Sequence, residues 1–207
     1  MTKASSCQVN KTIRVDNGQE DRISQGDIYK EIEHIEYVFE KDGYIHYSKI
    51  IFPLVIVLTQ DCDLAQDSTF RGFRGVKGKT QDKILVSALV APLYNSDHVF
   101  AGTHLDEIHK KHLKDIDQKE QSMATIPEDA TPGKFLKQNE RCRYHYLEFP
   151  KDIPIVPSII DFKHYFSVNI EQMILNRKEH FVCRVSDLYR QDISLRFANF
   201  LCRIGLP

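Results

Sequence analysis

The sequence lacks several patterns that would place it in a protein class at once. Its 207 residues include five cysteines, an odd number without a C-x-x-C pair, so neither a disulfide framework nor a zinc ribbon is expected. The formal net charge is -1, which excludes the global positive field of a strongly basic nucleic-acid-binding domain. No apolar run approaches the ~20 residues of a spanning helix, and the polar N-terminus lacks the apolar core of a signal peptide. We therefore expect a cytoplasmic protein with no membrane association.

Common catalytic signatures are missing as well. The chain contains no G-x-x-x-x-G-K-[ST], no G-x-G-x-x-G and no G-x-S-x-G, so P-loop nucleotide hydrolysis, dinucleotide binding and ordinary esterase chemistry have no support. His109 and His112 would be neighbours on a polar helix, but the H-E-x-x-H pattern is absent. We expect no metal site and no cofactor.

The most informative stretch runs from Phe52 to Asp63. After Pro53 come five consecutive branched apolar residues, which predict a strand buried on both faces. The strand ends in Asp61, Cys62 and Asp63, where a rigid element would hold ionisable groups at the edge of the core. One hypothesis is a catalytic or ligand-binding cluster, with Arg141, Arg143 or His145 folded over it. In the other, Cys62 fills the core and the two aspartates order a turn.

The remaining pattern predicts an α+β fold with a strongly curved antiparallel sheet. Residues 1–22 are expected to be an extended N-terminal segment, and residues 23–207 a single β-rich domain with a helical insertion at about 97–138. Lys41-Asp42-Gly43 is typical of a hairpin turn between two strands. Ser186 is the expected N-cap of a C-terminal helix, whose predicted apolar face comprises Leu188, Leu195, Phe197, Ala198, Leu201 and Ile204.

Two further segments carry residue types that suit nucleic acid. A glycine-rich loop supplies four cations that could contact phosphates: Arg71, Arg74, Lys77 and Lys79. Later, Arg141, Arg143 and Tyr144 precede His145, and basic and aromatic residues that alternate on a strand could bind an unpaired base. The alternatives are a solvated basic loop and an ordinary half-buried strand.

Three blocks resemble the MazF/PemK-type endoribonuclease toxins. Gly26-Asp27-Ile28-Tyr29 is similar to their Gly-Asp-Val-Tyr opening, Pro53–Asp61 to their Arg-Pro-x-Leu-Val strand and following loop, and Ile84–Val90 to their next apolar strand. The resemblance implies an SH3-like β-barrel with a C-terminal helix. It also implies that the catalytic chemistry is lost, because Phe52 stands in the place of the family's catalytic arginine and Val90 in that of its catalytic threonine.

A second resemblance is to uncharacterised proteins of bacterial mobile and defence islands. It rests on Cys62-Asp63, Arg141 and the run Tyr144–Leu147. Three functions follow as hypotheses: a toxin-like barrel that binds nucleic acid, RNA above DNA, in a defence or toxin–antitoxin context; an enzyme that uses Asp61, Cys62, Asp63 and His145 on a phosphodiester or small ligand; or a non-catalytic protein-interaction module. The oligomeric state stays open, a dimer included.

Overall fold

The computed structural model describes residues 15–16, 22–73, 81–105 and 136–202. Within these ranges the strands are β1 (Val15–Asp16), β2 (Asp27–Lys41), β3 (Tyr44–Val57), β4 (Ser87–Asn95), β5 (Tyr144–Leu147), β6 (Ser158–Asp161), β7 (Phe166–Asn169) and β8 (Phe181–Val185). The α-helices are α1 (Asp61–Phe70), α2 (Ser96–Phe100), α5 (Ile170–Leu175), α6 (Arg177–His180) and α7 (Asp187–Leu201). Three short 3-10 turns lie at Arg71–Phe73, Gln81–Lys83 and Phe162–His164.

The strands form one strongly curled antiparallel sheet, a half-barrel with helices against it. Their order is β1-β8-β2-β3-β4-β6-β5, and β7 also pairs with β4. The first half of β4 pairs with β7 and its second half with β6, so this strand carries the bend of the sheet. The prediction of a curved antiparallel α+β fold with a C-terminal helix is therefore confirmed at this level.

The predicted boundaries are only partly covered. Residues 106–135, with His109 and His112, lie outside the described residues, so the expected insertion is visible as α2 and its immediate neighbours. Val15 and Asp16 belong to the N-terminal segment of residues 1–22, and they pair with β8.

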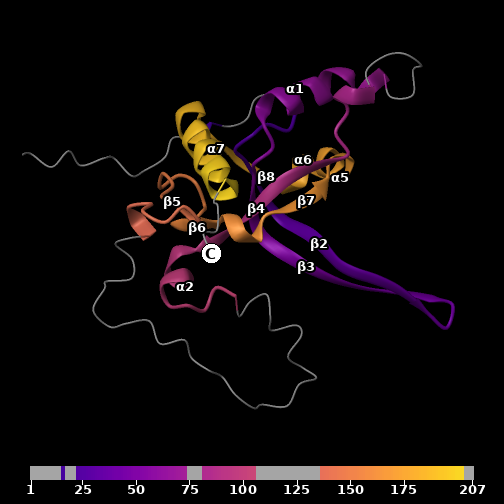
Figure 1. The fold of residues 1–207 in the computed structure, drawn as a ribbon, viewed down its shortest axis with the longest axis horizontal. Helices are drawn as coiled ribbons and strands as arrows, with labels where there is room; N and C mark the ends of the chain where they lie inside the picture. Colours follow the sequence, from indigo (N-terminus) through magenta and orange to yellow (C-terminus); the bar gives the residue numbers. More distant parts are fainter. Residues whose placement is uncertain (1–14, 17–21, 74–80, 106–135, 203–207) are drawn as a thin grey trace, which may run out of the picture.

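Two of the three hydrophobic clusters among the described residues lie on opposite faces of the sheet. Val55 and Val57 of β3 belong to a core with α1 and α5, whereas Ile56 and Leu58 belong to a core with α7, β5 and β6. Figure 1 shows α7 on one side of the sheet and α5 with α6 on the other. The prediction that the strand after Pro53 is buried on both faces is confirmed.

The apolar face of α7 differs from the predicted one. The buried residues are Ile193, Phe197 and Phe200, and the Phe197 and Phe200 rings pack on Phe162. The predicted face was wrong at Leu188, Leu195, Ala198 and Leu201, which are exposed, while Ile204 lies outside the described residues. Ser186 is the N-cap residue, but its side chain makes no capping hydrogen bond.

A long hairpin, β2–β3, extends from the body of the molecule (Figure 1). Its turn residues Asp42 and Gly43 have φ of 54° and 77°, the left-handed values that a two-residue hairpin turn requires. The predicted hairpin is confirmed. Only the start of β2 pairs with β8, and only the end of β3 pairs with β4. Over the rest of their length, among the described residues, β2 and β3 pair only with each other.

Two irregularities in β2 change which side chains face the core. Glu31 has φ of 55°, and this left-handed residue brings Tyr29 and Ile32 into the same core although three positions separate them. A register shift between Ile35 and Tyr37 is a bulge that changes the alternation again. The result is a bent ribbon.

No helix among the described residues is both long and apolar enough to cross a membrane.

Candidate functional site

The carboxylate of Asp61 ties three parts of the chain together. It accepts a two-pronged contact from the Arg22 guanidinium at 3.0 and 3.1 Å and the backbone N–H of Gln25 at 3.2 Å. The Arg190 guanidinium of α7 lies 3.5 Å away. Burial alone would raise the pKa of Asp61, but Arg22, Gln25 and Arg190 together hold it below its ordinary value. Asp61 therefore fastens the start of α1 to the loop before β2 and to α7.

The expected extended geometry at Asp61, Cys62 and Asp63 was wrong, because all three residues lie in the first turn of α1. Cys62 is exposed and does not fill the core, so that interpretation was wrong too. Its Sγ lies 3.6 Å from the Gln60 amide oxygen and 3.6 Å from the Asp63 carboxylate. Both neighbours are hydrogen-bond acceptors, and neither is a cation that would stabilise a thiolate.

Arg71 has a structural environment rather than that of a phosphate-binding cation. Its guanidinium forks onto Asp67, donates to the Leu85 carbonyl at 2.8 Å and lies 3.2 Å from Glu171. Asp67 is 2% exposed and also accepts the Leu85 N–H at 2.7 Å. Arg71 thus neutralises a buried carboxylate between α1 and α5. The other proposed cations of the loop, Arg74, Lys77 and Lys79, lie outside the described residues.

Arg143 is similarly engaged. Its guanidinium forms a two-pronged ion pair with Asp161, which is fully buried, and lies over the Tyr144 ring at 4.8 Å. The Asp161 contact raises the pKa of Arg143. Arg141 is exposed, and its backbone carbonyl accepts a hydrogen bond from Arg196 of α7.

His145 points from β5 towards α7 and is 3% exposed. Its Nε2 lies 3.9 Å from the Asp192 carboxylate, and its Nδ1 is without a hydrogen-bond partner among the described residues. Burial, with a smaller contribution from the Arg196 cation, lowers the pKa of His145 to about 3. The ring is therefore a neutral core group at physiological pH.

Because His145 is buried in its neutral form, folding stability should fall at acidic pH, and replacing His145 should remove this pH dependence. Unfolded His145 gains a proton near pH 6.5, whereas folded His145 gains it only near pH 3. The unfolded state therefore binds more protons between these values, and folding stability falls as the pH drops below 6.5. Over 1.5 pH units the loss is about 2 kcal/mol.

Between pH 6.5 and pH 5, we expect the free energy of unfolding of His145→Leu to fall by about 2 kcal/mol less than that of the wild-type chain. Urea unfolding at both pH values checks this. Equal losses in the two proteins would contradict it.

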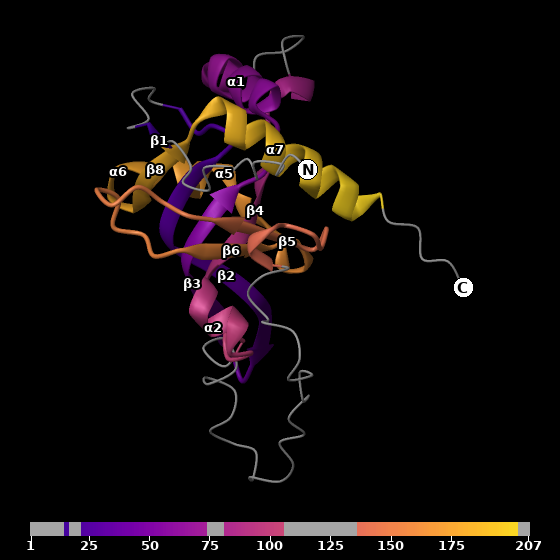
Figure 2. The same cartoon turned by 90° about the vertical axis from the view of Figure 1, so that its left-hand side faces the viewer.

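The structure does not join the predicted site residues into one centre. Asp61 contacts Arg22 and Arg190, Arg143 contacts Asp161, and His145 lies against Asp192. In Figures 1 and 2, α1 and β5 occupy separate parts of the molecule, with α7 between them. Among the described residues no group of three or more His, Cys, Asp or Glu side chains could hold a metal ion.

The two positions that the sequence resemblance would align with the catalytic residues of the MazF/PemK-type toxins are core positions in this protein. Phe52 is 6% exposed and stacks on Phe166 with ring centroids 4.8 Å apart. Val90 is fully buried. Neither position presents a group to a substrate.

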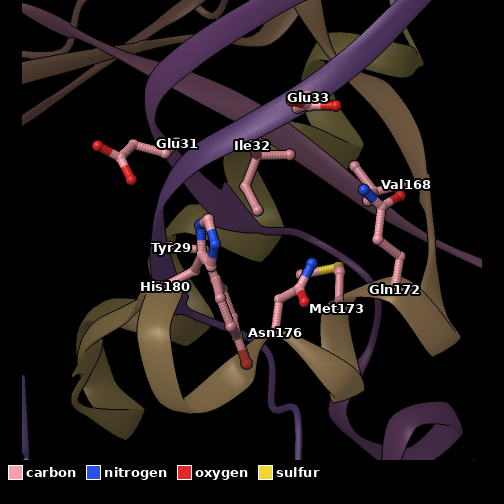
Figure 3. Close-up of a pocket in the computed structure, with 9 residues that line it drawn as sticks. All are labelled: Tyr29, Glu31, Ile32, Glu33, Val168, Gln172, Met173, Asn176 and His180. Atoms are coloured by element: carbon pink, nitrogen blue, oxygen red, sulfur yellow. The ribbon is translucent and has the colours of Figure 1, made fainter.

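A half-open cavity of about 240 Å³ lies between β2 and α5 (Figure 3). Ile32 and the Asn176 amide point into it, while the carboxylates of Glu31 and Glu33 point away from each other. His180 is held by a 2.8 Å contact from its Nδ1 to the Lys30 carbonyl. The two carboxylates therefore do not form the close pair that acid–base catalysis uses.

The most unusual surface is the projecting hairpin, residues 32–51, which we call the arm. Cross-strand partners share a face, so the register divides its side chains into two sets. The aliphatic face carries five exposed apolar residues: Ile35, Val38, Ile45, Tyr47 and Ile51. The aromatic face carries Tyr37 and Phe39, whose rings are stacked, with His46 stacked on Phe39 at 5.0 Å. Tyr44 stands at the tip and is 72% exposed.

Large apolar side chains on both faces of a two-stranded ribbon are not explained by packing among the residues that the structure describes. Such a ribbon has no core, and contiguous exposed apolar patches mark interaction sites. The sequence predicted the two strands and their turn but not this exposure, because Phe39 and Ile45 suit a buried strand equally well. A usable signal is the pair of consecutive strands with apolar residues in both alternation phases and no glycine before the turn.

Comparisons of the chain with known protein families, curated proteins and solved structures find no match.

Proposed function

We propose that the protein is an interaction module that binds another protein through the arm. The observation that carries this proposal is the set of exposed apolar residues on the arm, with Ile45 74% and Tyr44 72% exposed at its end. Burying such side chains against a partner is favourable by roughly 25 cal/mol per Å² of apolar surface. Their clustering on a projecting ribbon gives a partner access to both faces.

The charge of the arm favours a protein partner over a polyanion. It carries two lysines, Lys41 and Lys49, and four carboxylates, Glu33, Glu36, Glu40 and Asp42. Phosphate recognition depends on an excess of Lys and Arg, and here carboxylates are in excess. Arg71 and Arg143, two of the cations expected to bind nucleic acid, are held in ion pairs with buried aspartates.

A second candidate function is binding of single-stranded RNA. The stacked rings of Tyr37, Phe39 and His46 favour it, because unpaired bases stack on such platforms whatever their sequence. In that case binding would weaken with salt through Lys41 and Lys49.

The ancestry of the fold is part of the proposal. The curled half-barrel and the helix α7 are compatible with a divergent SH3-like barrel related to the MazF/PemK-type toxins. With Phe52 and Val90 in the core, such a barrel would serve binding in a defence or toxin–antitoxin setting rather than RNA cleavage.

The test uses two variants with matched exposure. Ile45→Glu places a charge on the arm, and Leu188→Glu places the same charge on α7, where the side chain is 73% exposed. Tagged full chains are purified from the source cells, with and without ribonuclease. We expect a protein partner with the wild type and Leu188→Glu that is lost with Ile45→Glu.

If Ile45→Glu keeps the same protein partners, the proposal fails. If the bound material is RNA, lost on ribonuclease treatment and at high salt, the second candidate replaces it.

A further inference from the structure

We propose that the partner of the arm is a second copy of this chain, with the two arms packed antiparallel across a two-fold axis and the tip of each in a groove at the base of the other. This inference rests on the proposed function. It is carried by the extent of the aliphatic face, by a groove continuous with that face, and by the spacing of residues along the arm.

The groove lies where the arm meets the body. It has a volume of about 380 Å³ and a mostly apolar lining that includes Ile51, Pro53, Leu93, Tyr94 and Val156. Ile51 belongs both to the groove and to the aliphatic face of the arm, so the two surfaces are continuous. Val156 is 55% exposed at the groove. An apolar tip would remove this lining from water.

The available area suits a dimer. The five residues of the aliphatic face and Val156 are 40 to 74% exposed. At ~180 Å² for a whole side chain of this size, they present on the order of 600 Å² of apolar surface. With the polar groups beside them this approaches the ~800 Å² per partner of a standard stable interface.

The spacing along the arm fits a two-fold axis. An isologous interface pairs positions that are equally far from the axis on opposite sides. An axis at Tyr47, halfway between the tip at Gly43 and the base at Ile51, sets Gly43 of one copy level with Ile51 of the other. Tyr44 is then level with Ile50, and both Ile50 and Ile51 line the groove. At ~3.4 Å per residue the tip then reaches the groove without any change in the arm.

The same arrangement brings opposite charges together. Glu40 pairs with Ile45 across the arm, and Lys49 pairs with Ile35 on the same face near its base. Antiparallel packing sets Glu40 of each copy at the level of Lys49 in the other, beside the Lys49–Glu33 contact present in one chain. A like-charge encounter is avoided, and the charges favour one register of the two arms.

The first experiment measures the mass of the purified full chain by sedimentation. We expect a dimer with an affinity in the micromolar range or tighter. Ile45→Glu and Val156→Glu are each expected to weaken the dimer at least ~100-fold, while Leu188→Glu leaves it unchanged. All three positions are exposed, so circular dichroism should show folded variants.

The second experiment tests the tip-to-base contact. Ile45→Cys and Lys49→Cys, which the axis at Tyr47 sets at the same level in the two copies, are made separately in a chain whose exposed Cys62 and Cys202 are replaced by serine. Mixing and oxidation should give a mixed disulfide dimer faster than either variant links to itself.

A wild-type chain that is monomeric at roughly 100 μM overturns this inference. So does a dimer that neither glutamate substitution weakens. If the isolated chain is monomeric but retains another protein from its source cells in an Ile45-dependent way, the proposed function stands without the second copy.

Discussion

Replacing Asp27 by leucine alone is expected to lower the free energy of unfolding by about 3–5 kcal/mol, because it leaves a buried arginine without its counter-charge. Asp27 is fully buried, and the Arg184 guanidinium contacts both of its carboxylate oxygens across the β2–β8 pair. Burial raises the pKa of Asp27, while Arg184 opposes that shift. Arg184 is only 6% exposed, so bulk water can hydrate little of the guanidinium in place of the carboxylate.

A double variant can show that the size of this loss comes from removing the carboxylate that Arg184 contacts. Asp27→Leu with Arg184→Met replaces the pair by apolar groups of similar size, and such replacements are often neutral or stabilising. We expect the double variant to recover all but about 1 kcal/mol of the lost unfolding free energy. The remaining loss comes from the Ser24 N–H, which donates a 2.9 Å hydrogen bond to Asp27 in the wild type and loses this acceptor in the variant. Urea unfolding of the three variants gives the coupling energy. Additive losses would contradict the prediction.

Asp27 illustrates what a local pattern can and cannot predict. The Gly26-Asp27 dipeptide is typical of a turn, and Gly26 has φ of 81°, a left-handed value that glycine adopts readily. The partner of Asp27 is far along the chain in β8, and nothing near either residue indicates the pairing. The same holds for Asp61, whose partners Arg22 and Arg190 come from opposite ends of the domain.

The elements that were predicted correctly depend on neighbouring residues. The branched run after Pro53 forms a doubly buried strand, and Asp42-Gly43 turns the hairpin, because sequence over a few residues determines both. The alternation in β2 was not predictable, since Ile28, Ile32 and Ile35 are spaced for neither strand nor helix. The left-handed backbone of Glu31 and the bulge after Ile35 explain this spacing, because each of them changes which side chains face the core.

The sequence-based prediction of the site departed further from the structure than the prediction of the fold did, and there is a physical reason for this. Charged residues were assigned to ligands because their types suit phosphate, yet a cation next to a buried carboxylate is also what a folded core requires. Arg71 and Arg143 have that second role. The arm, by contrast, is rich in residues that normally indicate a core, and only the fold shows that the described parts of the chain build no core around them.

Replacing Arg71 by alanine therefore tests which of its two roles is correct. We expect a loss of about 3–5 kcal/mol of unfolding free energy, because Asp67 stays buried with the Leu85 N–H as its remaining partner. Arg71→Lys should lose less, since one ammonium keeps the charge but cannot fork onto Asp67 and reach the Leu85 carbonyl together. Lys178→Ala, which removes an exposed cation, serves as control.

The two roles give opposite signatures. A phosphate-binding arginine would leave stability unchanged within about 0.5 kcal/mol on substitution and would lower the salt dependence of RNA affinity by about one charge. A structural arginine would shift the urea midpoint strongly, and any RNA affinity of the folded fraction would keep its salt slope. Because the Asp67 carboxylate lies 2% exposed beneath the guanidinium, the second outcome is the one that the contacts of Arg71 support.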